Sequence, residues 1–157
     1  MNPELVQRLS AAVGPAQVRA GAAELDLYRR DASNISGSAG VVVFPTTTEE
    51  VRQCVLACAE FAQPFVARGS GTGLSGGATP LDGAVVIALT KMNAVLSVDP
   101  MNRSAWVQPG VLNLDLSRAV AAYGLHFAPD PSSQQSCSIG GNVANNAGGP
   151  HCLADGV

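Results

Sequence analysis

The sequence predicts an α+β fold, in which a parallel β-α-β subdomain precedes a mixed, more antiparallel subdomain. Two observations support this prediction. A helical pattern lies between two short strand patterns in the first half of the chain, and several β-branched runs bounded by turn residues follow it. The composition agrees with a globular chain, since 46% of the 157 residues are hydrophobic and only 13% are charged.

Residues 1–37 are expected to form a helical lead-in. Pro3 is well placed at the start of a first helix, and the Gly14-Pro15 pair ends it. A second, weaker helix is expected over residues 17–27. The polar segment that follows, RRDASNISGSAG, is typical of a loop.

The β-α-β unit follows this lead-in. GVVVFP is typical of a short buried strand, and QPFVARG predicts a second one. Between them Thr47 and Glu50 have the spacing of a capping box at the start of a helix. A connection of this length predicts parallel strands with a right-handed crossover. The apolar face of the helix is expected to consist of Val51, Val55, Cys58 and Ala62.

The second half of the chain predicts strands first and turns later. GAVVIAL, AVLSVDP and SAWVQPG are β-branched runs bounded by turn residues, as expected of strands. NLDLSRAVAAYG predicts a helix with Asn113 as its N-cap and Gly124 at its C-terminal end. Residues 125–157 are rich in turn residues and show little regular pattern. This order of elements favours the α+β class over a doubly wound sheet.

Charge and hydropathy exclude several classes of protein. A net charge of −3 offers no basic surface, so nucleic-acid binding is not expected. No segment approaches the ~18 consecutive apolar residues of a membrane span, and the N-terminus MNPELVQRLS lacks the apolar run of a secretory signal. We therefore expect a cytoplasmic protein without an integral membrane segment.

The four cysteines do not predict a metal site. Cys54 and Cys58 are four residues apart, on one face of the expected helix. Cys137, Cys152 and the two histidines stand in no metal-binding pattern. Burial of Cys54 and Cys58 as small hydrophobic side chains is favoured over a metal-binding role.

The stretch ARGSGTGLSGG, at residues 67–77, raises the question of a ligand. Gly71, Gly73 and Gly76 match the G-x-G-x-x-G pattern of dinucleotide-binding folds, but a strand follows where those folds need a helix. That interpretation therefore fails. A run of small residues can still present consecutive backbone N–H groups to an anion, and Thr72 adds a hydroxyl donor. We favour a ligand loop over a flexible linker, because glycine-dense backbone is costly to order.

A second glycine-dense stretch, SIGGNVANNAGG at residues 138–149, strengthens this interpretation. Its glycines are interleaved with Asn142, Asn145 and Asn146, whose amides offer further hydrogen bonds. Two such stretches separated by strands predict two walls around one extended ligand. One wall would hold phosphates, and the other would bond to a heterocycle.

Four motifs occur in a fixed order: FPTTTEEV, PFVARGSGTGLSGGA, WVQPGV and APDPSSQQSCSIGGNVANNAGGPHC. Together they resemble the flavin-binding domain of the vanillyl-alcohol-oxidase/PCMH-type FAD-linked oxidases. The group of bacterial glycolate oxidase and D-lactate or D-2-hydroxyglutarate dehydrogenases resembles the chain most. The resemblance covers roughly residues 25–153, and the order of several independent motifs makes it specific.

The resemblance implies FAD as the cofactor. Attachment is expected to be noncovalent, because Thr72 stands where some members of the family have the histidine that bonds to FAD. The first glycine stretch would hold the pyrophosphate, and the second would follow the adenosine and flavin portions. The FAD contacts implied by the resemblance are Gly69, Ser70, Gly71, Thr72, Gly73, Gly76, Gly77, Pro109, Gly110, Pro129, Asp130, Ser133, Ser138, Gly140, Gly141, Asn142, Asn145 and Gly148.

The longer relatives also imply an activity, the oxidation of a small D-2-hydroxy acid such as glycolate or D-lactate by the flavin. Residues 38–157 would be the N-terminal part of the FAD-binding domain, incomplete at the C-terminus and without the substrate cap domain. No residue is therefore assigned a catalytic or metal-binding role, and His151 is expected to be a structural hydrogen-bonding residue. The resemblance alone implies an iron–sulfur or other electron-transfer subunit and a peripheral position at the inner face of the membrane. A non-catalytic FAD- or nucleotide-binding module and an inactive fragment are the alternatives.

Overall fold

A four-stranded sheet organises the first of the two units into which the chain divides, Met1–Lys91 and Met92–Val157. The structure, a computed structural model, describes residues 1–155, so residues 156 and 157 of the predicted domain lie outside the described part. Four strands cross the sheet in the order β1, β2, β4, β3. Their bounds are Val18–Arg19 for β1, Ala39–Val43 for β2, Ala84–Ala88 for β4 and Phe65–Arg68 for β3.

The predicted parallel direction of β2 and β3 is confirmed, but the two strands are not neighbours. Both pair in parallel with β4, which lies between them, and Val86 is opposite Val42 on one side and Val66 on the other. Every residue of β4 is buried, as expected of a central strand with both faces covered. β3 has the exposed Phe65 and takes the edge of the sheet.

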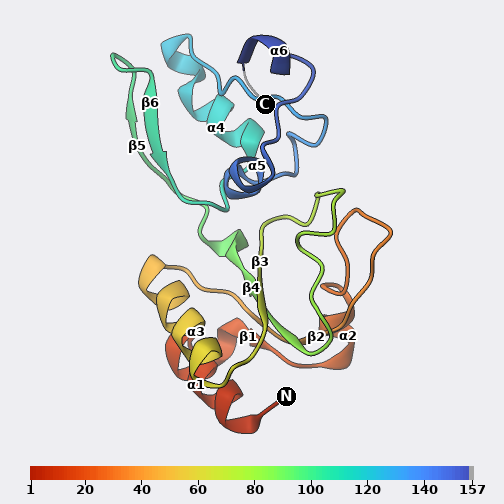
Figure 1. Cartoon of the computed structure of the whole chain (residues 1–157). Helices are drawn as coiled ribbons and strands as arrows, with labels where there is room; N and C mark the ends of the chain where they lie inside the picture. Colours follow the sequence, from red (N-terminus) through yellow and green to blue (C-terminus); the bar gives the residue numbers. More distant parts are fainter. Residues whose placement is uncertain (156–157) are drawn as a thin grey trace. The chain divides into compact units, whose positions relative to one another are not determined.

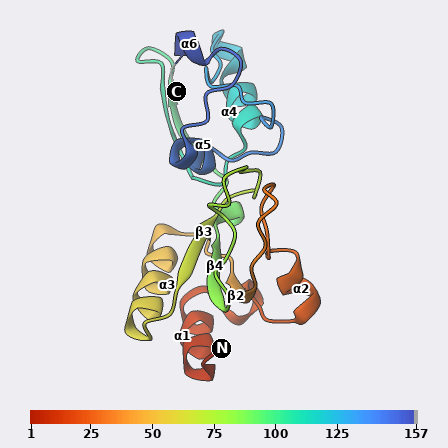
Figure 2. The same cartoon turned by 45° about the vertical axis from the view of Figure 1, so that its right-hand side comes forward.

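Helices cover both faces of this sheet (Figures 1 and 2). α1 (Pro3–Val13) and α3 (Thr48–Glu60) pack on one face, and α2 (Ala22–Asp26) lies on the other. Alternation along the strands supplies both cores. Val41, Val43, Val85 and Ile87 pack with α1 and α3, while Val42, Phe44 and Val86 form the core beside α2.

Both long helices of this unit begin where the sequence predicts. Asn2 caps α1 ahead of Pro3, and the hydroxyl of Thr47 accepts a hydrogen bond from Glu50 N–H, 3.1 Å away. The predicted capping box is only half formed, because the Glu50 carboxylate accepts from Thr46 N–H instead of reaching back to Thr47. The predicted apolar face is also shifted. The buried residues of α3 are Cys54, Ala57 and Cys58, while Ala62 lies beyond the helix.

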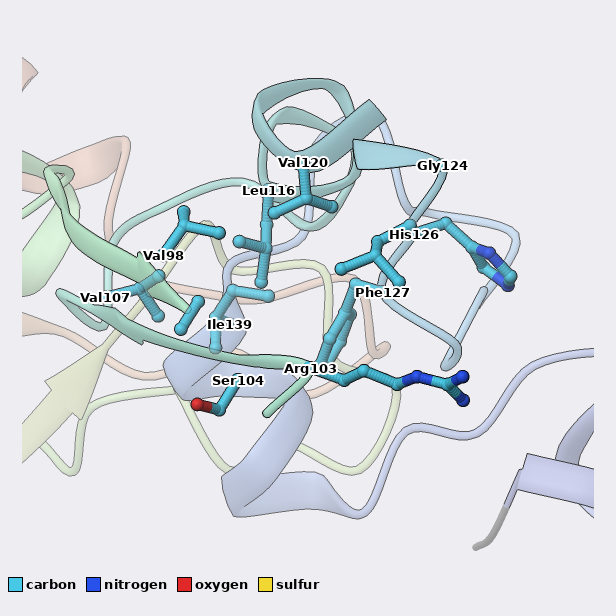
Figure 3. A pocket seen from close by; sticks show the side chains of 12 residues that line it. Val98, Arg103, Ser104, Val107, Leu116, Val120, Gly124, His126, Phe127 and Ile139 are labelled. Atoms are coloured by element: carbon cyan, nitrogen blue, oxygen red, sulfur yellow. The ribbon is translucent and has the colours of Figure 1, made fainter. Parts of the chain in front are cut away.

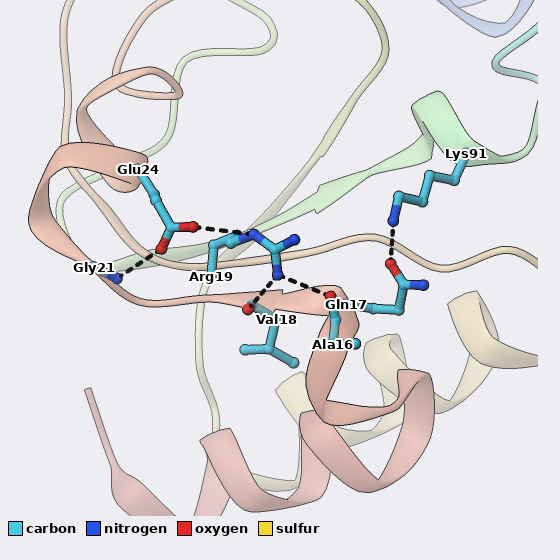
Figure 4. A network of polar contacts seen from close by, with 7 residues as sticks. All are labelled: Ala16, Gln17, Val18, Arg19, Gly21, Glu24 and Lys91. Atoms are coloured by element: carbon cyan, nitrogen blue, oxygen red, sulfur yellow. Dashed lines mark hydrogen bonds and ion pairs between the residues drawn. The ribbon is translucent and has the colours of Figure 1, made fainter.

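The predicted helix over residues 17–27 is wrong in its extent. A short 3-10 turn, η1 (Pro15–Gln17), leads into β1, and only α2 is helical. The edge of the sheet overrides the weak local pattern, because Val18 and Arg19 pair antiparallel with β2. Figure 4 shows Arg19 bonding to the carbonyl oxygens of Ala16 and Val18 while its Nε lies 3.1 Å from the Glu24 carboxylate.

The second unit begins with an antiparallel hairpin, which confirms the predicted antiparallel region. β5 (Val95–Asp99) pairs with β6 (Ser104–Val107), and α4 (Asn113–Val120) packs on the hairpin through Leu116 and Val120. A 3-10 turn, η3 (Ala121–Tyr123), ends at Gly124 in the left-handed region, as predicted. The remaining elements are η2 (Leu89–Lys91) in the first unit and α5 (Ile139–Asn145) and α6 (Cys152–Asp155) in the second.

Two predictions about the second unit are wrong. Residues 125–155 were expected to lack regular structure, yet they contain α5 and α6. α5 forms despite its glycines because Ile139 is buried in the core of the unit. Asn113 is not an N-cap: Leu112 holds that position, and the side chain of Asn113 is buried.

Candidate functional site

The first glycine loop, defined here as residues 69–79, joins β3 to β4 without any helix, as predicted. Gly71 and Gly76 adopt positive φ angles of 73° and 78°, which a residue with a side chain rarely adopts. Within residues 1–155, none of the backbone N–H groups from Ser70 to Gly77 donates to another protein group. The loop therefore presents a run of free donors that an anion can use.

Arg68 lies beneath this loop and is only 8% exposed. Its Nη1 donates to the carbonyl oxygen of Ala78 at 3.2 Å, and its guanidinium lies 5.5 Å from the ring centroid of Tyr28. A Cβ atom at Gly71 would collide with this guanidinium. The positive φ angle and the contact with the buried Arg68 together favour glycine at position 71 without any ligand.

Gly73 has a different environment. A Cβ atom there would meet only Oδ2 of Asp31, at an ordinary contact distance of 3.8 Å, and the φ angle is not in the left-handed region. The protein can thus accept an alanine at position 73. The open space beside Gly73 is available to a ligand.

The segment at residues 28–37 lies against the first glycine loop (Figure 1). Ala32 N–H donates to Gly73 O at 3.1 Å, and Ala78 N–H donates to the Asp31 carboxylate at 3.3 Å. The sequence predicted only a polar loop in this segment. Asp31 was therefore missed, and the single signal for it was a carboxylate in a segment otherwise rich in serine and glycine.

The second glycine stretch is partly helical. Gly140, Gly141, Asn142 and Asn145 lie in α5, so the expectation of a loop is wrong for them. The turn at Pro109 is brought directly against this helix: Gly140 N–H donates to Pro109 O at 2.8 Å, and a Cβ atom at Gly140 would lie 2.7 Å from the Pro109 side chain. Gly140 is required for this close approach.

A buried amide joins three parts of the second unit. Asn113 Nδ2 donates to Pro129 O at 2.9 Å and to Asn142 Oδ1 at 3.0 Å, and Asn142 in turn donates to Cys137 Sγ at 3.2 Å. The network fixes α5 to α4 and to the segment before it. The sequence predicted Asn113 as an N-cap, because asparagine is common at the start of a helix. That pattern gave no sign that its side chain points into the core.

The hydroxyl group of Ser138, the N-cap residue of α5, is buried and unpaired among the described residues. The residue is 1% exposed, and its Oγ has no hydrogen-bond partner among the described residues. Buried hydroxyl groups are nearly always bonded, so an unpartnered one calls for an explanation. A polar cofactor beside α5 would provide the missing partner.

Asp130 and His151, which lie on either side of the second glycine stretch in the sequence, form a hydrogen-bonded pair. His151 Nδ1 lies 2.7 Å from Asp130 Oδ2, and Asp130 N–H donates to Gly148 O at 3.1 Å. The hydrogen bond from His151 lowers the pKa of Asp130 from its ordinary value. A cavity of about 470 Å³ opens beside the pair and is lined also by Ser117, His126 and Gln134.

The predicted FAD contacts divide between the two units. The contacts at residues 69–77 lie on the first glycine loop of the first unit. In the second unit, Pro109 contacts Gly140, and Pro129 and Asn142 share Asn113, while Gly148 contacts Asp130. Gly110 donates its N–H to Met92 O, which joins two segments of the unit, and Ser133 O accepts from Cys137 N–H in a local turn.

A larger cavity, of about 710 Å³, lies between the β5–β6 hairpin and α4 (Figure 3). Val98, Leu116, Val120 and Ile139 point into it, and Arg103 lies at its rim. Its lining contains none of the predicted FAD contacts. Its walls are mostly apolar side chains that the core of the unit also uses.

Residues 1–155 contain neither a metal-ion site nor a membrane-spanning helix. No group of three or more His, Cys, Asp or Glu side chains is arranged to hold a metal ion. No helix in the described part of the chain has the length and apolar character needed to cross a bilayer.

Similarity to known proteins tests the predicted family, fold and cofactor. Residues 39–157 match the sequence family described as FAD binding domain. The chain is 51% identical over 117 residues to the glycolate oxidase subunit GlcD of Escherichia coli K12, covering 74% of this chain and 23% of that protein. It is 37% identical over 158 residues to D-lactate dehydrogenase of Anaerostipes hadrus, covering 99% and 33%.

The fold agrees with these relatives. A crystal structure of p-cresol methylhydroxylase superimposes with a TM-score of 0.78 at 25% identity, covering 89% of this chain and 28% of that one. The predicted resemblance, the α+β fold of the PCMH type and FAD as the cofactor are thereby confirmed. The chain spans about a quarter to a third of the length of these relatives.

Proposed function

The chain belongs to the FAD binding domain family, and from this premise we propose that it is the FAD-binding part of an oxidoreductase acting on a D-2-hydroxy acid such as glycolate or D-lactate. The observation that supports this proposal most is the 51% identity to a glycolate oxidase subunit, in a chain that carries both glycine stretches. The similarity to a D-lactate dehydrogenase supports the same class of substrate.

The proposed cofactor contacts of each unit rest on groups of that unit alone. The free N–H groups from Ser70 to Gly77 suit the pyrophosphate, since two neighbouring phosphates need several donors. The unpartnered hydroxyl of Ser138 and the amide of Asn145 suit a polar part of FAD beside α5. The roles of the other predicted contacts stay proposals of the same kind.

Noncovalent attachment agrees with the loop. Within the first glycine loop Thr72 offers only a hydroxyl, and the loop contains no histidine that could bond to the flavin. Acid precipitation of the loaded protein should therefore leave the flavin in the supernatant. Flavin that stays with the pellet would contradict noncovalent binding.

When bound, FAD supplies the redox chemistry by accepting a hydride equivalent from the substrate carbon. The residues described here bind and orient the cofactor. No side chain of this chain is proposed to accept the substrate hydroxyl proton. An electron-transfer subunit and a peripheral membrane position are proposed from the resemblance alone.

The first test is a visible absorption spectrum of the purified chain after FAD is added and the sample is desalted. Retained flavin bands at about one flavin per chain are expected. Gly73→Val should abolish retention, because its side chain fills space that the protein leaves open. Leu27→Ala, at a side chain that is 73% exposed, serves as a control away from the loop.

The substrate class is tested separately, by anaerobic mixing of the loaded protein with glycolate, D-lactate or L-lactate. Bleaching of the flavin by glycolate and D-lactate, but not by L-lactate, supports the oxidoreductase. Stoichiometric flavin that none of the acids bleaches would support a non-catalytic FAD-binding module instead. A chain that retains no flavin would fit the inactive fragment.

A further inference from the structure

We propose that residues 28–37 are a functional part of the cofactor site: through Asp31, Thr79 and Arg68 they clamp the first glycine loop in the shape that binds FAD. The inference rests on the proposed pyrophosphate role of that loop. The segment precedes residue 39, where the family match begins, so the match assigns it no role. Asp31 and Thr79 act as positioning residues.

Four hydrogen bonds join the segment to the loop, one of them from Thr79 Oγ1 to Ile35 O at 3.5 Å. Ala32 N–H donates to Gly73 O at 3.1 Å, near the middle of the loop. At the end of the loop, Ala78 N–H donates to Asp31 Oδ2 at 3.3 Å, and Asp31 N–H donates to Thr79 Oγ1 at 3.4 Å. Asp31 therefore acts in both directions, with its carboxylate as acceptor and its N–H as donor. The bonds bracket residues 73–79 and limit their freedom.

Arg68 supports the same part of the loop from below. Its Nη1 donates to Ala78 O, while Asp31 accepts from Ala78 N–H, so both polar groups of one residue are fixed. The Asp31 carboxylate also compensates the buried guanidinium charge. Burial lowers the pKa of Arg68, and the charge of Asp31 opposes that change.

The Asp31 carboxylate is held ionised by its surroundings. Burial alone would raise the pKa of Asp31, but hydrogen bonds from Ser33, Ala78 and Thr79 together lower it. Several hydrogen-bond donors hold the ionised carboxylate in one position. Removing its negative charge would leave the buried positive charge of Arg68 without that carboxylate.

Glycines in both segments make this close contact possible. A Cβ atom at Gly37 would collide with Pro80 O, and one at Gly76 would lie 2.9 Å from Cδ1 of Ile35. The Gly71 site is filled by the Arg68 guanidinium. Three glycines thus serve the contact between the segment, the loop and Arg68, although from sequence alone the two in the loop were assigned to FAD.

The clamp matters for binding because of entropy. Ordering a glycine-rich loop costs conformational entropy. If the loop is already ordered before the cofactor binds, that loss no longer weakens the free energy of binding. The donors from Ser70 to Gly77 have no partner among residues 1–155, so nothing on the ligand side of the loop orders them. The contacts with residues 28–37 fulfil that function.

The test uses a matched pair of variants of the full chain. Thr79→Val keeps the shape and removes the hydroxyl, whereas Thr79→Ser keeps the hydroxyl. We expect FAD to bind about five- to tenfold more weakly to Thr79→Val, and within about twofold of normal to Thr79→Ser. Asp31→Asn should weaken binding at least as much as Thr79→Val. Asp82→Asn removes an exposed carboxylate that bonds Ser38 and should have no effect.

Hydrogen exchange of the chain without FAD gives a second readout. Thr79→Val should accelerate exchange in peptides covering residues 30–37 and 69–79, but not in the buried strand β4. Thr79→Ser should restore protection. Unchanged exchange in Thr79→Val would overturn the clamp, and so would faster exchange with unchanged FAD affinity.

These outcomes separate the clamp from the proposed function. If Gly73→Val abolishes FAD binding while Thr79→Val and Asp31→Asn bind normally, only the clamp is wrong. If Gly73→Val binds FAD normally, the pyrophosphate role of the loop is wrong and the clamp fails with it. A chain that binds no FAD in any form overturns both.

Discussion

His151 Nδ1 lies 2.7 Å from Asp130 Oδ2, and the same histidine directs its backbone N–H at Oδ1, 3.5 Å away. The two residues are 21 positions apart, and Gly149 lies between them in a left-handed conformation with no room for a side chain beside Asp130. The pair ties the segment that follows the second glycine stretch to the segment that precedes it. This geometry agrees with the structural role expected for His151.

The pair predicts a measurable change in the titration of Asp130. The hydrogen bond from His151 lowers its pKa, so His151→Ala should return that pKa towards the ordinary value of 3.8. The folded pKa lies below the unfolded one, so the stabilisation is present above the unfolded pKa and is lost as pH falls through the folded pKa. NMR titration of the carboxyl carbon checks this, with Asp99, bonded to Asn102, as the unchanged control.

Asn113 predicts a stability effect in the second unit. Asn113→Ala removes the hydrogen bonds to Pro129 O and Asn142 Oδ1 and leaves Pro129 O without its donor, which should cost about 1–3 kcal/mol. Urea unfolding followed by circular dichroism measures the loss. Asn102→Ala, which removes an exposed amide bonded to Asp99, is the matched control and should cost less than about 1 kcal/mol. Equal losses in the two variants would show that the buried network is not important.

Leu9 tests whether the N-terminal helix belongs to the core. Leu9 is 0% exposed and packs in the core that α1 shares with α3 and the sheet. Leu9→Ala should therefore cost about 2–5 kcal/mol. Leu27→Ala, at a side chain that is 73% exposed, should change stability by less than about 0.5 kcal/mol. A small effect of Leu9→Ala would favour the predicted separate lead-in at residues 1–37, a boundary that otherwise stays a prediction.

The cysteines predict an order of chemical labelling. Burial raises the pKa of Cys54 to about 12 and that of Cys58 to about 11, so both thiols stay protonated in the folded protein. Iodoacetamide at pH 8 should modify the partly exposed Cys152 first and reach Cys54 and Cys58 only after denaturation. Peptide mass spectrometry gives the order. Early labelling of Cys54 would mean that α3 opens readily in the native state.

The same raised pKa values predict alkaline sensitivity. The unfolded thiols ionise near pH 8.5 while the folded ones remain neutral. Above that pH the unfolded state therefore binds fewer protons than the folded state, so stability falls as pH rises. Replacing Cys58 with alanine should reduce this alkaline slope in urea unfolding measured between pH 8 and 10. A slope unchanged by the substitution would contradict the assignment to this thiol.

The sequence predicted those elements whose signals are local. The start of α1 at Pro3, the Thr47 cap of α3, the left-handed Gly124 and the strand patterns are all confirmed. Each depends on a residue type that only one local conformation satisfies. Strand order was not predictable in the same way, because β2 and β3 carry the same pattern whether they pair with each other or with β4.

The candidate site shows the same division. The glycine positions were found from sequence, but the reasons for several of them were not. Gly71 and Gly140 avoid Arg68 and Pro109, contacts that exist only in the folded unit. Asp31 was missed because its importance depends on residues more than 40 positions later, at Ala78 and Thr79. Tertiary partners of this kind leave no periodic signal.

The central position of β4 in the sheet has a consequence for co-translational folding of the protein on the ribosome. β2 and β3 both precede β4 in the chain, so until β4 emerges β2 can pair only with the two-residue β1, and β3 has no strand partner. The first glycine loop lies between β3 and β4. The strand that follows the loop is therefore missing until residues 84–88 emerge. Nascent chains should thus bury Val41 and Val43 abruptly, in one late step. A translational pause before residues 84–88 emerge would leave β2 and β3 without their shared partner and exposed to chaperones.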